Sequence, residues 1–160
     1  MSGVLPVAQQ GEPILKLIAA EVTEQEFGSQ WLKQLLHAMH ETMLDQQGVG
    51  IAAPQVYVSK RVIIVASRPN LRYPDAPMMA PIGMINPEIL SVSTQQVIGE
   101  EGCLSVPNKR RGEVMRAEHI EIGYFDVDGQ RFETRLSGFA ARIVQHEIDH
   151  LNGRLFVDYL

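Results

Sequence analysis

Cysteine is nearly absent from this sequence: Cys103 is the only one among 160 residues, so no disulfide can form within the chain. The segment 1–15 has neither a basic start nor a sustained apolar run, so no secretory signal is expected. No segment approaches the roughly 18 consecutive apolar residues that a membrane helix needs. We therefore expect a soluble protein of a reducing, cytosolic compartment, with no membrane as partner.

Basic charge is also scarce, because 14 Lys and Arg stand against 19 Asp and Glu and leave a net charge of -5. A chain with this balance has no general attraction for phosphate backbones, and we find no direct nucleic-acid motif. Apolar residues make up 45% and charged residues 21%, values that are typical of a soluble globular protein. The length predicts a single domain over residues 1–160 with one hydrophobic core.

The first half of the chain contains one clear helical pattern. Apolar residues recur at three-and-four spacing over 31–43, which predicts an amphipathic helix with Ser29 as its N-cap. The pattern ends at the glycine turn 48–50. The β-branched run 61–66 predicts a buried strand, and 83–90 is expected to be another.

The middle of the chain is expected to contain a loop and a hairpin. Prolines within and beside 70–81 exclude regular structure there and predict a surface loop. Apolar and polar residues alternate over 120–124 and again over 132–136, which is the period of half-buried strands. Asp128-Gly129 between these strands predicts a tight hairpin turn.

The segment 138–151 is mostly apolar, with Ser137 as its expected N-cap. Its polar residues Arg142, Gln145 and Asp149 recur at helical spacing, which predicts a buried helix with a narrow solvent-facing stripe. Strands and helices do not alternate regularly along the chain, so a parallel sheet is not expected. The sequence thus predicts an α+β fold of largely antiparallel sheets packed around a buried C-terminal helix.

This C-terminal helix carries the H-E-x-x-H pattern that begins at His146 and ends at His150. Residues four apart stack on one helix face, so both imidazoles can be directed at one cation, with Glu147 beside them as a base. The alternative is a pair of hydrogen-bonded core histidines. The spacing favours half of a metal site.

A catalytic metal needs a third protein ligand. Cys103 is the best candidate, because a thiolate binds borderline metals well, although a lone cysteine is often only a small buried apolar residue. Asp158 follows His150 too closely to fold back easily. The remaining candidates stay open as competing ligands; they are His37, His40 and His119.

Three segments together resemble the motifs of the peptide deformylase family, in the same order and at similar separations. They are GVGIAAPQ at 48–55, EGCLS at 101–105 and QHEIDHL at 145–151. The resemblance implies hydrolytic removal of the formyl group from N-terminal formylmethionine of nascent peptides, with release of formate. It also implies a bacterial cytoplasm or an organellar matrix, and contact with the ribosome.

The same resemblance implies roles for individual residues. The metal would be Fe(II), with Zn, Ni or Co also suitable, and its ligands would be Cys103, His146 and His150. Glu147 would be the catalytic carboxylate. The resemblance further implies that Gln55 and the backbone amide of Leu104 bind the formyl oxygen, and that backbone at Gly50 pairs with the peptide.

We expect the pocket for the methionine side chain to be lined by Val49, Phe139 and Ile143, although ordinary core packing would explain them equally well. Arg110 is expected to contact the peptide backbone, or Arg111 in its place; a solvated charge is the alternative.

Gly99 stands where the family often has a branched apolar residue, which predicts a more open pocket. Two other functions are weighed against deformylation, namely a metallopeptidase and a non-catalytic metal-binding module.

Overall fold

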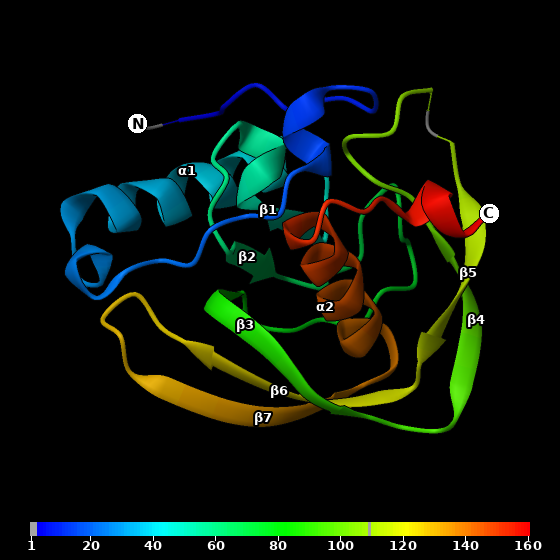
Figure 1. Ribbon diagram of the computed structural model, residues 1–160. Coiled ribbons are helices and arrows are strands. Elements are labelled where there is room, and N and C mark those ends of the chain that lie inside the picture. Colours follow the sequence, from blue (N-terminus) through cyan, green and yellow to red (C-terminus); the bar gives the residue numbers. More distant parts are fainter. Residues whose placement is uncertain (1–2, 109) are drawn as a thin grey trace.

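The computed structural model describes residues 3–108 and 110–160. Its elements are α1 (Gln30–Asp45), β1 (Gly50–Ala52), β2 (Val62–Val65), β3 (Ile82–Val92), β4 (Gln96–Glu101), β5 (Gly112–Ala117), β6 (His119–Phe125), β7 (Arg131–Ser137) and α2 (Gly138–Leu151). Short 3-10 turns are found at Pro13–Lys16, Glu24–Glu26, Ala53–Val56 and Phe156–Tyr159. Figure 1 shows the sheet, the separate β4–β5 ribbon and α2 between them.

The strands pair in antiparallel fashion throughout the described sheets. A five-stranded sheet has the order β1-β2-β3-β6-β7, and β4 and β5 form a separate two-stranded ribbon. This arrangement confirms the predicted α+β class with a C-terminal helix. The hairpin between β6 and β7 turns at Gly129, which has a φ of 87° and donates its N–H to Asp126 O.

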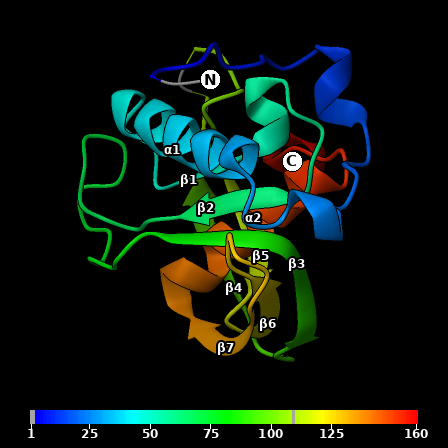
Figure 2. The ribbon, with the colours of Figure 1, turned by 90° about the vertical axis from the view of Figure 1, so that its left-hand side faces the viewer.

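Both faces of the sheet are covered at β2, where every residue is buried. Ile63 and Val65 pack on the side of α2, whereas Val62 and Ile64 pack on the side of α1. A strand covered on both faces reads as a continuous apolar run, as observed here. Figure 2 shows α1 beside β1 and β2, at the end of the sheet away from β6 and β7.

The predicted elements are largely present, with one error at the start of α2. The Ser29 side chain accepts a hydrogen bond from Leu32 N and caps α1 as expected. Ser137 occupies the N-cap position of α2, but its side chain makes no capping hydrogen bond. Segment 70–81 lacks regular secondary structure, as its prolines predict.

The expected solvent-facing stripe on α2 is wrong. Arg142 is buried at 8% exposure and its guanidinium donates to Val114 O at 2.9 Å. Gln145 exchanges two hydrogen bonds with the backbone of Ala117, each 3.0 Å long. Asp149 accepts from Arg116 at 2.7 Å. The polar residues therefore face β5, because the β4–β5 ribbon covers this side of the helix.

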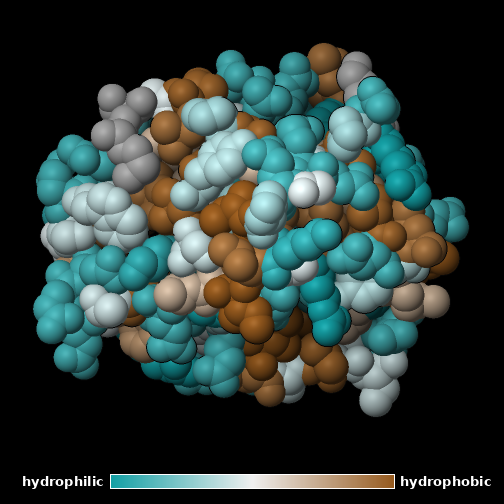
Figure 3. All heavy atoms as spheres, turned by 45° about the horizontal axis from the view of Figure 1, so that its top comes forward, coloured by the Kyte–Doolittle hydropathy of each residue, from teal (hydrophilic) through white to brown (hydrophobic). Residues whose placement is uncertain are grey.

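No helix among the described residues is long and apolar enough to cross a membrane. Apolar side chains nevertheless reach the surface. Figure 3 shows them gathered in a band across one face, between polar margins. Contiguous apolar surface of this kind is where partners and ligands commonly bind.

Candidate active site

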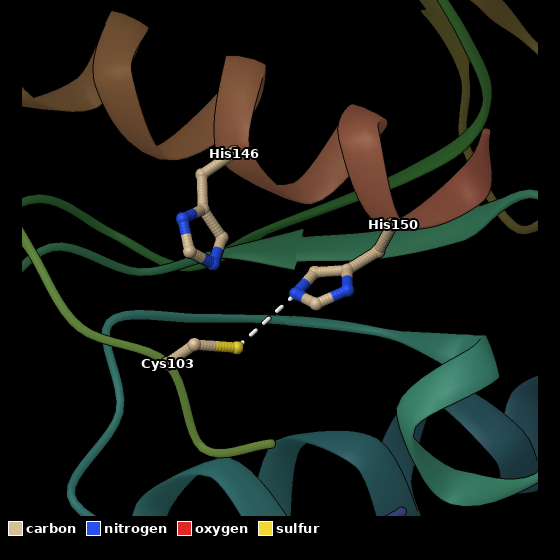
Figure 4. A group of neighbouring side chains, drawn as sticks. All are labelled: Cys103, His146 and His150. Carbon is tan, nitrogen blue, oxygen red and sulfur yellow. Dashed lines mark hydrogen bonds between the residues drawn. The ribbon is translucent and has the colours of Figure 1, made fainter. Parts of the chain in front are cut away.

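Three buried side chains from two distant parts of the chain meet beside α2. His146 and His150 project from successive turns of that helix, and Cys103 follows β4 (Figure 4). One ligand atom of each lies within 4.8 Å of the other two, and Cys103 Sγ is 3.3 Å from His150 Nε2. Sequence reasoning named all three, and the fold brings them together.

The chemistry of this donor set fits a borderline divalent metal. Burial by itself raises the pKa of the Cys103 thiol, but His150 and His146 outweigh burial, so this pKa lies well below its ordinary value. The anionic sulfur is the form that binds metals. One thiolate and two imidazoles suit iron, zinc, cobalt or nickel, and three protein ligands leave a coordination position free.

Glu101 orients the first histidine. Its Oε1 lies 2.9 Å from His146 Nδ1, so the other ring nitrogen is left to face the cluster. Arg116 forms two hydrogen bonds of 2.9 Å to the same carboxylate, and Arg142 adds one of 2.6 Å. Burial by itself raises the pKa of Glu101, but the hydrogen bonds and charges of Arg116 and His146 lower it by more than burial raises it. The pKa therefore lies below its ordinary value, and the carboxyl stays ionised. Sequence reasoning missed this orienting role, although Glu101 lies within the EGCLS motif.

Glu147 is placed to accept a proton. It is 4% exposed, and its Oε1 has no hydrogen-bond partner within residues 3–108 and 110–160. Burial is the main reason that the pKa of this carboxyl rises to about 7. A carboxyl with such a pKa can both take and return a proton near neutrality.

Gln55 is a buried and fixed amide rather than a surface residue, at 1% exposure. Its side-chain oxygen accepts from Ala52 N at 2.9 Å, and its Nε2 donates to Ser105 Oγ at 3.0 Å. The same nitrogen lies 3.5 Å from Cys103 Sγ, so an amide N–H is directed at the cluster. Leu104 borders the same cavity.

The cluster opens on a small cavity of about 30 Å³. Val49, Gly50, Phe139 and Ile143 are among the residues that line it. A space of this size is enough to hold a water molecule beside the cluster.

The similarity of this chain to known proteins agrees with the geometry. The family described as polypeptide deformylase matches residues 4–160. Peptide deformylase 2 of Nostoc sp. is 49% identical over 155 residues, which cover 97% of this chain and 85% of the relative. The chain belongs to the peptide deformylase family. Members of this family are metal-dependent hydrolases. The described residues include one group that could hold a metal ion, Cys103, His146 and His150.

Solved structures of this family match over nearly the whole chain. A Met-Ala-Ser-bound class I type b peptide deformylase from Acinetobacter baumannii has a TM-score of 0.97 and 63% identity, with 100% of both chains covered. The actinonin-bound structure from the same organism has a TM-score of 0.90 and 57% identity, with 99% of both chains covered.

The cavity of this deformylase has a wall that sequence reasoning missed. Arg72 and Tyr73 line it from the proline-rich loop 70–81, and the Tyr73 hydroxyl accepts from Gly102 N at 2.9 Å. The loop had been expected only to lie at the surface. The sequence signal that could have indicated this wall is the aromatic Tyr73 between Arg72 and Pro74.

Arg110 is exposed and is not among the residues that line the cavity, whereas Arg111 lies with its guanidinium carbon 4.5 Å from the Tyr73 ring centroid. Gly99 does not open the pocket, because the space beside its Cα is filled by the Arg142 guanidinium. The expectation of a more open pocket is therefore wrong.

Replacement of Gly50 by Ala should impair activity far more than folding. A Cβ at this position would lie 2.6 Å from Glu147 Oε2 and 2.7 Å from Ile143 Cγ2, so both buried side chains must shift. We expect a loss of about 1–3 kcal/mol in the free energy of unfolding and a large fall in kcat. Denaturant titration and formate release measure the two effects. Unchanged kcat would contradict the close packing of Gly50 against Glu147.

Replacement of Glu101 by Gln should destabilise the protein by about 3–5 kcal/mol, because two buried arginines lose their shared carboxylate. Because the pKa of Glu101 is lowered in the folded protein, the free energy of unfolding should depend on pH. Its stabilising contribution is present above the ordinary value of 4.5 and is lost as pH falls below it. The variant should therefore lose less stability on acidification than the parent protein; parallel acid-unfolding curves would contradict this.

Proposed function

We propose that this chain removes the formyl group from the N-terminal formylmethionine of nascent peptides and releases formate. The observation that carries the proposal is the buried Cys103–His146–His150 cluster, with Glu147 and Gln55 beside it, in a chain of the peptide deformylase family. Glu147 and Gln55 are not needed to hold a metal, which disfavours a non-catalytic metal-binding module.

Cys103, His146 and His150 would hold one divalent metal ion, for which we propose Fe(II) in the cell. When bound, such a metal lowers the pKa of a water molecule toward neutrality and polarises the carbonyl that is attacked. Glu101 would keep the His146 ring in place through its hydrogen bond to Nδ1.

Glu147 would act as general base and then as general acid. Water adds its oxygen to the formyl carbon, Glu147 takes a proton from that water, and the carbon–nitrogen bond breaks as the proton passes to the amine. The N–H groups of Gln55 and of the Leu104 backbone would donate to the formyl oxygen while it gains negative charge. One such donor contributes about 3–4 kcal/mol in comparable sites.

The peptide would lie along Gly50, with its first side chain among Val49, Phe139 and Ile143, which line the cavity. Arg110, outside this lining, would contact the peptide backbone. The Met-Ala-Ser-bound structure from A. baumannii supports a peptide ligand of this kind.

The proposal is tested with two peptides assayed side by side, formyl-Met-Ala-Ser and the unblocked Met-Ala-Ser. We expect formate from the first and no cleavage of the second. Cleavage of the unblocked peptide without formate release would favour the metallopeptidase. Binding of metal without turnover of either peptide would favour the non-catalytic module.

The proposed Fe(II) makes a separate prediction about oxygen. Air should inactivate the freshly purified protein by oxidising the iron and Cys103, whereas protein loaded with Ni or Co should keep its activity. Formate release before and after aeration, with anaerobic samples as the control, measures the effect. Activity that survives prolonged aeration would argue for zinc.

We further propose that residues 1–160 act as one catalytic domain in the cytoplasm or an organellar matrix, near the ribosome that supplies the nascent peptide.

A further inference from the structure

Arg142 is a buried guanidinium at the edge of the cavity, one helical turn before His146. Its Nη2 donates to Val97 O at 2.7 Å, and its Nη1 donates to Val114 O at 2.9 Å and to Glu101 at 2.6 Å. These acceptors lie on both strands of the ribbon, so the planar end of the side chain is held from several directions. A side chain held in this way cannot swing aside as a flexible apolar one would.

Gly99 is what allows the guanidinium to lie there. A Cβ on Gly99 would be 2.7 Å from Arg142 Cζ, 2.8 Å from Nη2 and 2.9 Å from Nε. Real Cβ atoms essentially never approach other atoms so closely. A side chain at position 99 and the guanidinium of Arg142 therefore exclude one another, and the two positions form a matched pair.

Arg142 also separates two hollows. It lines the cavity beside the metal ligands, and together with Gly99 and Phe139 it lines a second hollow of about 170 Å³ against the ribbon. Phe139 is the other residue shared by the two linings. Because Arg142 belongs to both linings, we expect that removal of its guanidinium would join the two hollows and lengthen the cavity.

We propose that Arg142, seated on Gly99, is a specificity-determining residue that separates the cavity from the hollow against the ribbon and limits the length of the first side chain of the substrate. This inference rests on the proposed function, because the cavity must be the place where that side chain binds. The buried, hydrogen-bonded guanidinium of Arg142 forms the wall between the cavity and the hollow, and it fits there because residue 99 is a glycine without a side chain.

The test compares two formylated tripeptides that differ only in the first residue: formyl-Met-Ala-Ser, and an analogue with 2-aminooctanoic acid, whose side chain is an unbranched six-carbon chain. The parent protein should prefer methionine. Arg142→Ala should shift the ratio of the two kcat/KM values toward the longer side chain by about tenfold or more, a range typical of one or two methylenes in an apolar pocket. A merely structural role would lower both values alike and leave the ratio unchanged, which would overturn the proposal.

A second set of variants guards against loss of folding and tests the matched pair. Gly99→Ile alone should displace the guanidinium and change the ratio, whereas Gly99→Ile combined with Arg142→Leu should restore folding and the preference for methionine. A double variant that is no better than Gly99→Ile would overturn the pairing. Arg135→Ala is the control, because the Arg135 side chain is 85% exposed and it should leave the ratio unchanged.

The assays distinguish failure of the proposed function from failure of the inference about Arg142. If the parent protein releases no formate from either peptide, the proposed function is wrong and the inference about Arg142 falls with it. If formate is released but the ratio does not move in any folded Arg142 variant, only the inference about Arg142 is wrong. Thermal melting of each variant establishes which of them are folded.

Discussion

Glu147→Gln should lower kcat for formyl-Met-Ala-Ser by about 10³-fold or more while the protein keeps its metal. The amide has nearly the same shape as the carboxyl, so it fits the buried space against Gly50, but it cannot take a proton from water and return it to the amine. Removal of a general acid–base group costs about 10²–10⁴ in rate. Formate release under saturating substrate and metal analysis of the same sample measure the two quantities.

The matched control for this experiment is Glu113→Gln, which makes the same chemical change at an exposed position of β5. It should leave both turnover and metal content as they are. Two results for Glu147→Gln would contradict its proposed role. Unchanged turnover would refute the proton transfer, and loss of the metal would show that Glu147 serves in binding rather than in catalysis.

Cys103→Ser should remove both metal and activity. The Cys103 sulfur, held anionic by the two histidines, supplies the negative charge among the three proposed ligands, and a neutral hydroxyl is a much weaker ligand. Loss of a residue that hydrogen-bonds to a metal ligand typically lowers metal affinity about 10–100-fold. Loss of the ligand itself should lower the affinity by more than that. Metal content after dialysis, and the rise in melting temperature on adding metal, measure the change.

His119→Ala is the control, since His119 was a competing third ligand and is exposed on β6. It should keep its metal and its activity. A chelator should inactivate the parent protein, and added Fe(II), Ni or Co should restore it. Retention of one metal per chain by Cys103→Ser would contradict the assignment of the sulfur as a ligand.

Local patterns in the chain were enough to predict most of its elements and part of the site. The helical spacing from Trp31 to Met43 and the alternation that leads to β6 and β7 depend on neighbours a few residues apart. Strands β4 and β5 were not predicted, because Gln, Glu and Gly weaken the strand pattern there. These strands depend on each other and on α2 for their shape.

The site, too, is partly predicted by local spacing and partly dependent on contacts between distant segments. The four-residue spacing of His146 and His150 already places two imidazoles on one helix face. The arrival of Cys103 beside them, 3.3 Å from His150 Nε2, depends on contacts between segments 47 residues apart. The sequence pointed to Cys103 only through the choice of chemically suitable ligands and the family resemblance.

The sequence by itself determined the helical and strand periodicities, the pair of histidines and the motifs of the family. Only the tertiary structure decided that the polar stripe of α2 faces inward. Side-chain polarity led us to expect water on that face, but the β4–β5 ribbon covers it and supplies the partners that Arg142 needs. A buried charge is stable only where distant segments bring it acceptors, and that arrangement cannot be read from the residues of the helix alone.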